Sequence, residues 1–242
     1  MSNIKAKKTT KKVDQKEEVK VVAKKTESLF DNTKSYNISE AIEIVKKINK
    51  AKFDASFEVH FRLGIDPKKG DQQVRGAVSL PNGTGKTVRV AAFVSPANEK
   101  AVKAAGADLV GGEELIAEIK KTEKTDFQVA VAEPEMMKNL ALIAKILGTR
   151  GLMPSPKNDT VTQNPAKAVE ELKKGKISFK NDDTANIHAV IGKVSFESDK
   201  LAQNFSVFLE TIRKAKPSSS KGVYIKNASV NSTMGHGVKV SL

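Results

Sequence analysis

The fold is decided by residues 87–110, which read TVRVAAFVSPANEKAVKAAGADLV. Residues 87–94 are mostly apolar and predict a strand, residues 98–105 predict a helix, and residues 107–110 predict a second strand. Gly106 stands where the helix should end. A strand that is apolar on both faces is typical of a parallel sheet covered by helices. This stretch therefore indicates an α/β unit.

The same order of strand and helix continues to residue 147. Residues 113–121 predict a helix, residues 127–132 a strand, and residues 134–147 a helix with Pro134 in its first turn. Alternating strands and helices imply a parallel sheet between two layers of helices. We therefore expect residues 81–160 to form a three-layer α/β domain.

The chain before residue 81 follows other patterns. Asn37 and Glu40 have the spacing of a capping box, and apolar residues at helical intervals follow as far as residue 48. Apolar and polar residues then alternate over residues 56–63, which predicts a strand with one buried and one exposed face. Residues 74–80 predict another strand. Such elements are typical of an α+β domain.

Helices and amphipathic strands return after residue 161. The expected elements are helices at 164–175 and 201–212 and strands at 177–180, 187–191, 223–230 and 238–242. Because the segments before and after the α/β unit both combine helices with amphipathic strands, we interpret the unit as an insertion. Residues 31–80 and 161–242 should form one discontinuous α+β domain, interrupted by residues 81–160, with two chain crossings as a hinge.

The charge of the chain points to a polyanionic partner. Lys and Arg number 42 against 28 Asp and Glu, which gives a formal net charge of +14. Residues 161–242 hold 13 of these cations and 7 acids, whereas residues 81–160 hold 11 cations and 10 acids. We therefore expect nucleic acid to bind mainly on the discontinuous domain.

The first 30 residues are predicted to be a disordered, basic N-terminal extension. Residues 1–25 contain nine Lys and three acidic residues, and their apolar residues show no spacing suited to packing. A solubilising arm and a weak contact with any phosphate surface both fit this composition. No specific site is assigned to the extension.

Composition excludes several classes of function. The chain has no Cys and only three His, which excludes disulfides, thiol chemistry and a zinc site made of His alone. No apolar stretch approaches the roughly 18 residues that a membrane span needs, so we expect a soluble, cytoplasmic protein. We expect no metal, no cofactor and no membrane partner.

One motif is similar to the phosphate-binding loop of nucleotide-dependent enzymes. Gly83-Thr84-Gly85-Lys86-Thr87 has the required ending, but Leu80 stands where the first Gly is needed, and a strand follows instead of a helix. We interpret the motif as a turn between domains and keep a nucleotide-dependent enzyme as the rival hypothesis. No Ser, His and acid stand in a motif typical of a catalytic triad. We therefore expect no enzyme.

The polar loop Asn231-Ser232-Thr233-Met234-Gly235-His236-Gly237 is the most informative stretch for binding. It lies between two predicted strands, and Met234 would be exposed at its tip. An exposed Met can pack on a sugar or a base, while Thr233 and Gly235 can hydrogen-bond to 2′-OH and phosphate groups. From composition alone, an ordinary hairpin turn fits as well.

Two further features each have two interpretations. His60 and His188 lie on the polar sides of predicted strands, where each could donate to phosphate or simply be exposed. The loop at residues 150–157, rich in Gly and Pro, could be a secondary RNA contact or an ordered connection.

Eight short motifs occur in a fixed order along the chain. They are Ala51-Lys52-Phe53, Leu63-Gly64-Ile65-Asp66, Asp71-Gln72-Gln73-Val74-Arg75-Gly76, Leu80-Pro81-Asn82-Gly83-Thr84-Gly85-Lys86, Ala104-Ala105-Gly106-Ala107-Asp108, Arg150-Gly151-Leu152-Met153-Pro154, Lys221-Gly222-Val223-Tyr224 and Ser232-Thr233-Met234-Gly235. Together they resemble the motifs of the bacterial large-subunit ribosomal protein L-one family, the proteins of the mobile ribosomal stalk. The resemblance covers about residue 32 to the C-terminus and leaves the N-terminal extension unexplained.

The resemblance implies an α/β fold with two parts joined by a hinge that opens and closes. One part is a discontinuous α+β domain of split β-α-β type that binds RNA, and the other is an inserted Rossmann-like domain. It also implies binding to a junction of large-subunit rRNA, help in releasing deacylated tRNA from the exit site, and repression of the protein's own operon mRNA. Other ribosomal components would be partners, and the protein would be a cytoplasmic monomer off the ribosome. A general basic RNA chaperone is the alternative.

Carried over by position, the family's RNA surface has two parts. Lys52 would meet phosphate, and Phe53 would support the RNA-facing surface or lie in the core with its edge exposed. Ser56 and Glu58 would bind 2′-OH groups or base donors. The second part, which would press into the shallow minor groove, is Thr233, Met234 and Gly235. Weaker candidates from neighbouring strands are Lys180, His188 and Lys193.

Two positions depart from the pattern of the family. Thr149 stands where Pro is usual, and Asp159 stands where Gly is usual at the second crossing. Both lie in the loop and hinge region, so they bear on the opening of the domains more than on RNA binding.

Overall fold

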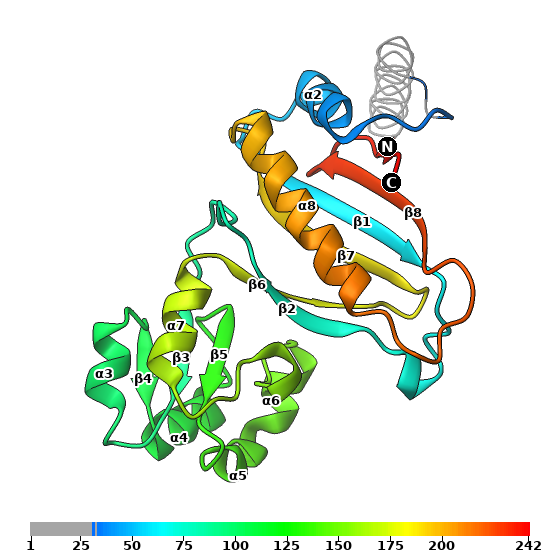
Figure 1. Cartoon of the computed structure of the whole chain (residues 1–242). Helices are drawn as coiled ribbons and strands as arrows, with labels where there is room; N and C mark the ends of the chain where they lie inside the picture. Colours follow the sequence, from blue (N-terminus) through cyan, green and yellow to red (C-terminus); the bar gives the residue numbers. More distant parts are fainter. Residues whose placement is uncertain (1–30, 32) are drawn as a thin grey trace, which may run out of the picture.

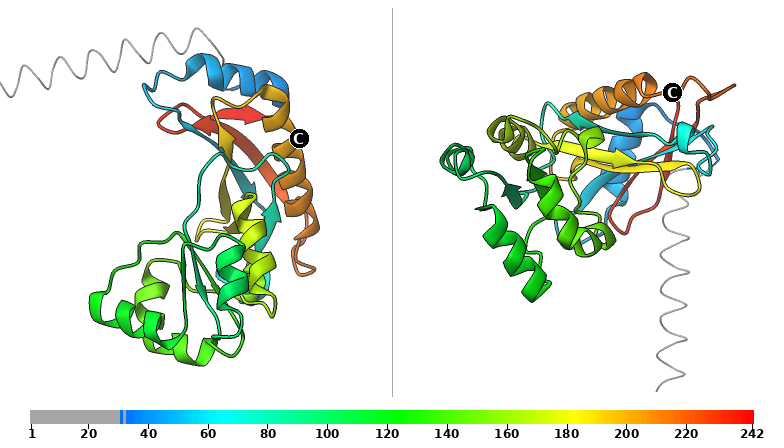
Figure 2. Two further views of the ribbon diagram at one scale, coloured as in Figure 1. Left: turned by 90° about the vertical axis from the view of Figure 1, so that its left-hand side faces the viewer. Right: turned by 90° about the horizontal axis from the view of Figure 1, so that it is seen from below.

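The computed structural model describes residue 31 and residues 33–242, so the extension predicted at 1–30 lies outside the described residues. The described chain has a larger and a smaller lobe at opposite ends of the molecule (Figure 1, Figure 2). No helix of this part of the chain is long and apolar enough to cross a membrane.

The larger lobe is built on an antiparallel sheet with the strand order β7-β1-β8-β9. Its strands are β1 (Ser56–Leu63), β7 (Asn186–Lys193), β8 (Ile225–Ser232) and β9 (Val238–Val240). Helices α2 (Ile38–Ile48) and α8 (Ser198–Lys214) pack on one face of this sheet, which Figure 1 shows most clearly for α8. Within the described residues the other face carries no helix, and we refer to it as the open face.

Local sequence explains both kinds of element in this lobe. Alternate residues of β1 point to opposite faces, so the fully buried Phe57 and Phe61 lie under the helices while His60 lies on the open face. The predicted capping box begins α2, where the Asn37 N–H donates to Glu40 Oε2 at 3.4 Å. The strand and the helix are therefore confirmed as predicted.

A second, two-stranded sheet extends the larger lobe toward the smaller one. It pairs β2 (Arg75–Ser79) with β6 (Lys176–Lys180) in antiparallel register. Phe179 of β6 joins the main core, where its ring lies 5.6 Å from that of Phe208 in a perpendicular arrangement. The two sheets of this lobe therefore share one hydrophobic core.

The smaller lobe is a parallel sheet of three strands, as its sequence predicts, and the strand order is β4-β3-β5. The strands are β3 (Val90–Phe93), β4 (Leu109–Gly111) and β5 (Val129–Ala132), and the helices are α3 (Glu99–Ala104), α4 (Glu113–Thr122), α5 (Met137–Leu140), α6 (Ala144–Thr149) and α7 (Pro165–Lys173). One face packs on α4, α5 and α6, and the other packs on α3 and α7. The predicted α/β class, with helices on both faces of a parallel sheet, is confirmed.

The helix predicted at 134–147 differs in detail. It begins at Met137 and is divided into α5 and α6 by a short 3₁₀ helix, Ala141–Ile143. Three residues per turn bring Leu140 and Ile143 to the same side, and both are fully buried against the sheet. The segment thus keeps its apolar face buried although it is not one continuous α-helix.

The path of the chain between the lobes also differs from the sequence pattern. Val161 forms a parallel bridge with Ala132, and α7 buries Val169 against the smaller sheet. The chain returns to the larger lobe only after α7, at Gly175. There the two crossings touch, because a Cβ on Gly175 would lie 2.5 Å from the Cα of Gly83. Gly175 also has a φ of +106°, which glycine adopts readily.

Candidate RNA interface

The loop after β8 is held against the start of β1. The Thr233 N–H donates to the Ser56 carbonyl at 3.0 Å, and the Ser56 N–H donates to Thr233 Oγ1 at 3.2 Å. The Thr233 hydroxyl in turn donates to Glu58 Oε1 at 3.1 Å. Residues far apart in the sequence therefore hold this loop in place.

Met234 projects from this fixed loop into solvent. Its side chain is 92% exposed, and its φ of +66° lies in the left-handed region, which is uncommon for a residue other than glycine. Uncommon backbone conformations persist only where the surrounding structure holds them, and they gather at binding sites. The exposed thioether is thus an apolar group presented on a fixed backbone.

Phe53 lies beside Met234 and is 57% exposed. The two residues line one pocket of about 280 Å³, which we name the Phe53–Met234 pocket. The pocket is lined by Ile48, Asn49, Lys50, Ala51, Phe53, Thr233, Met234, Gly235 and His236. Four predicted site residues, Phe53, Thr233, Met234 and Gly235, are therefore brought together from opposite ends of the sequence.

Three polar residues of this pocket were missed by sequence reasoning. Asn49 and Lys50 follow α2, and His236 follows Met234 by two residues. Lys50 adjoins the quoted motif Ala51-Lys52-Phe53, and His236 lies within the quoted polar loop at residues 231–237, which was the available signal. Asn49 gave no signal, because the end of a helix is a common place for Asn.

The remaining residues predicted near β1 occupy different positions. Lys52 is exposed next to Phe53, whereas Ser56 is 9% exposed and holds Thr233 through its main chain. Lys193 pairs in register with Ser56, but its ammonium is 3.6 Å from Asp54 Oδ2 and 3.2 Å from the Asp54 carbonyl. Its charge is therefore already partly neutralised.

Lys180 is not brought together with these residues. It lies at the end of β6, opposite Arg75 in the two-stranded sheet. Its side chain is exposed, but it belongs to a different sheet from the Phe53–Met234 pocket. Of the weaker candidates, only His188 and Lys193 lie in the four-stranded sheet.

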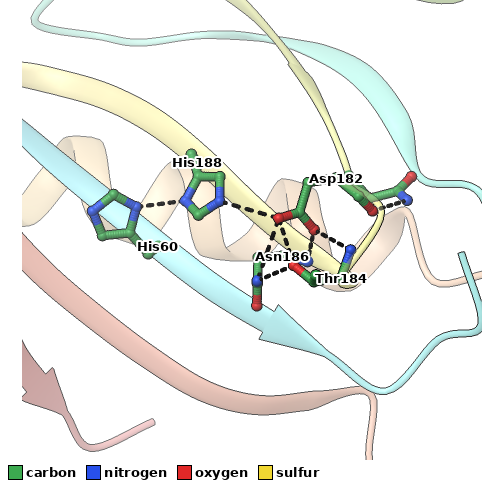
Figure 3. A network of polar contacts seen from close by, with 6 residues as sticks. His60, Asp182, Thr184, Asn186 and His188 are labelled. Atoms are coloured by element: carbon green, nitrogen blue, oxygen red, sulfur yellow. Dashed lines mark hydrogen bonds and ion pairs between the residues drawn. The ribbon is translucent and has the colours of Figure 1, made fainter.

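A row of polar side chains crosses the open face from β8 to the loop before β7, and Figure 3 shows the part of it from His60 to Asp182. His60 Nε2 lies 2.8 Å from Asn231 Oδ1, His60 Nδ1 lies 2.7 Å from His188 Nδ1, and His188 Nε2 lies 3.6 Å from Asp182 Oδ2. We name Asn231, His60, His188 and Asp182 the histidine row. A hydrogen bond between two Nδ1 atoms needs one donor and one acceptor, so the two rings share a single proton there.

Asp182 closes this row in a compact turn. Its carboxylate accepts from the Thr184 N–H at 2.9 Å, the Asn186 N–H at 2.6 Å and the Thr184 hydroxyl at 2.6 Å. Partial burial raises the pKa of Asp182, but these hydrogen bonds outweigh it and hold the pKa well below its usual value.

Replacing Asp182 with Asn should lower the free energy of unfolding at pH 7 by about 1 kcal/mol, because the charged acceptor is lost from an exposed site. A carboxyl with a lowered folded-state pKa stabilises the fold above its unfolded pKa of about 4, and that contribution is lost as the pH falls. Urea denaturation between pH 7 and pH 2.5 should therefore show the two proteins converging in acid. Asp183→Asn, at an exposed neighbour, is the control and should show no such trend.

The fold therefore joins a parallel α/β lobe to a mainly antiparallel lobe that carries an exposed apolar pocket. Residues 45–236 match the ribosomal protein L1p/L10e family, and the chain belongs to that family. Members of this family are structural, RNA-binding proteins and not enzymes.

Curated relatives agree with this assignment. The large ribosomal subunit protein uL1 of Streptococcus sanguinis (strain SK36) is 49% identical over 227 residues, which cover 91% of this chain and 99% of the relative. Proteins of the same name from Streptococcus pneumoniae strains Hungary19A-6 and 70585 match with the same identity and coverage. The resemblance inferred from the eight motifs is thereby confirmed.

Proposed function

We propose that this chain is a structural protein of the large ribosomal subunit in the cytoplasm, and that it binds a junction of large-subunit rRNA to form the mobile stalk. In this role it helps release deacylated tRNA from the exit site, and it represses its own operon by binding the mRNA. It associates with other ribosomal components on the ribosome and is a monomer off it.

One observation carries the proposal: the Phe53–Met234 pocket presents two apolar side chains on a fixed backbone in a chain of net charge +14. An exposed apolar pocket with polar residues at its edge is typical of an interaction site. RNA offers sugar and base faces for apolar contact and phosphates for the surrounding cations. Lys50 and Lys52, on either side of Ala51, supply cations beside the pocket.

A competition experiment tests the proposal. Labelled rRNA junction is bound to the full chain and displaced with unlabelled junction or with an unrelated RNA duplex of equal length. A specific site should prefer the junction by about a thousandfold or more, by analogy with specific nucleic-acid complexes. Equal displacement by both RNAs would favour the alternative, a general basic RNA chaperone.

Removing residues 1–25 should leave the preference for the junction unchanged. The deletion removes nine Lys and three acidic residues, so it should weaken non-specific binding and reduce its dependence on salt. Binding constants for junction and duplex RNA, measured over a range of salt concentrations, check this. Loss of the preference would mean that the extension takes part in recognition.

A further inference from the structure

A second cavity lies between the two lobes and has a volume of about 540 Å³. Its lining comes from the first crossing, from β2, β6 and β7 of the larger lobe, and from β5, α7 and the turn at 158–160 of the smaller lobe. This volume is within the range of small-molecule sites, which is about 300 to 1,000 Å³. We name it the interlobe cavity.

The cavity has an apolar wall from each lobe. The smaller lobe contributes Val88, Val129 and Leu172, and the larger lobe contributes Ala77, Ile177 and Val190. Val88, Val129, Ile177 and Val190 are only partly buried by the protein itself. A space between two aliphatic walls suits a flat ring, which would bury these side chains on both of its faces.

One amide in the cavity has no partner. Asn158 Oδ1 is buried without a hydrogen bond, and Asn158 Nδ2 makes none within the described residues. An unsatisfied buried acceptor costs about 1–3 kcal/mol. The side chain as a whole is partly exposed and lines the cavity, so its amide is a polar group within reach of a ligand there.

The charges that line the cavity leave one free cation among the described residues. Lys176 lies 3.0 Å from Asp159 Oδ2 and 2.9 Å from Glu171 Oε2, so its charge is neutralised. Lys86 is exposed and makes no ion pair in this part of the chain. The single free ammonium matches one phosphate, and the two apolar walls match a flat ring. A ligand that joins these two groups would therefore fit the cavity.

We propose that the interlobe cavity holds one unstacked nucleotide of the bound RNA, with its base between the apolar walls, the base edge on the Asn158 amide and its phosphate on Lys86. The proposal rests on the proposed RNA-binding function. The histidine row connects the Met234 loop with the cavity. His188 lines the cavity and also contacts His60, whose other nitrogen contacts Asn231 two residues before Thr233. RNA on the Met234 loop can thus follow the open face to the cavity.

This assignment gives a role to Lys86, which lies in the sequence motif that only partly matches a phosphate-binding loop. The residues after Lys86 lead into a strand, so this loop lacks the helix N-terminus that binds phosphate in such a motif. The side chain alone would meet the phosphate, and binding of a free nucleotide should be weak. No hydrolysis is part of the proposal.

Titration of the full chain with AMP, CMP, GMP and UMP, followed by NMR of its labelled methyl groups, tests the cavity directly. At least one nucleotide should shift Val88, Val129, Leu172 and Ile177 together and reach saturation at millimolar concentrations. Lys86→Ala should raise the Kd for the monophosphate about tenfold but leave the Kd for the matching nucleoside unchanged. Asn158→Leu should raise both Kd values about fivefold.

Two controls separate this proposal from the function on which it rests. Met234→Ala should weaken junction RNA but leave the monophosphate Kd unchanged, and junction RNA should displace the bound monophosphate. If about 20 millimolar nucleoside monophosphate, enough to saturate a site of millimolar affinity, shifts no methyl signal, the cavity assignment is wrong. Shifts only elsewhere in the chain would also overturn it, even if junction binding is intact. Loss of junction specificity with intact cavity binding would overturn the proposed function instead.

Discussion

Replacing Met234 with Ala should weaken binding of the rRNA junction by about 1–3 kcal/mol. The loss of one base-stacking contact, or the introduction of one mismatched base pair, has a cost of this size in nucleic-acid complexes. The side chain is 92% exposed, so its removal leaves no cavity and should not lower the free energy of unfolding. Ala meets the same left-handed backbone as Met at a φ of +66°, so the loop is held as before. The loss should therefore appear in RNA affinity alone.

A filter-binding titration at fixed salt measures this effect, with circular dichroism to confirm folding. Leu142→Ala is the matched control, because Leu142 is 66% exposed but lies in the smaller lobe, away from the Phe53–Met234 pocket. Its affinity for the junction should equal that of the parent chain. Equal affinities for the Met234 variant and the parent would remove this loop from the RNA surface.

Replacing Phe208 with Ala should lower the free energy of unfolding by about 3–5 kcal/mol. Phe208 is fully buried, and its ring lies 5.8 Å from that of Phe61 and 5.6 Å from that of Phe179. Those two rings come from β1 and β6, which belong to different sheets. The substitution would therefore open a cavity where α8 joins both sheets of the larger lobe.

Urea denaturation followed by circular dichroism measures this loss. Phe53→Ala is the matched control, since it removes the same atoms from a ring that is 57% exposed, and its cost should be below about 1 kcal/mol. The opposite ranking, with the Phe53 variant the less stable, would show that Phe53 belongs to the core, the second interpretation that the sequence left open for it.

Much of the candidate site was within reach of sequence reasoning. The motifs at Ala51-Lys52-Phe53 and at Ser232-Thr233-Met234-Gly235 led to the residues that line the Phe53–Met234 pocket. The contact between His60 and His188 was not predicted, although both were noted on polar faces. The contact depends on the register of β1 and β7, which places His60 opposite His188. The register of two strands that are far apart in the sequence cannot be predicted from their polar residues.

Asp159 shows a similar limit. The sequence shows only that it replaces a usual Gly of the family, while the structure gives it a φ of +55° and an ion pair with Lys176 at 3.0 Å. The backbone there has the conformation that Gly adopts most easily. An ion pair across the second crossing offsets part of the cost, and no local pattern could have indicated that partner.

The sequence by itself determined the order of most strands and helices, which face of each is buried, and that a parallel unit interrupts an antiparallel one, although it did not show that the helix expected at 134–147 is divided. Those properties follow from the period of the apolar residues and from local caps, which act within a few residues. Only the tertiary structure decided which element covers which face: α7 packs on the smaller sheet, although the sequence grouped it with the larger lobe. An apolar stripe specifies that a helix must be covered but does not specify by what, because burial is non-directional.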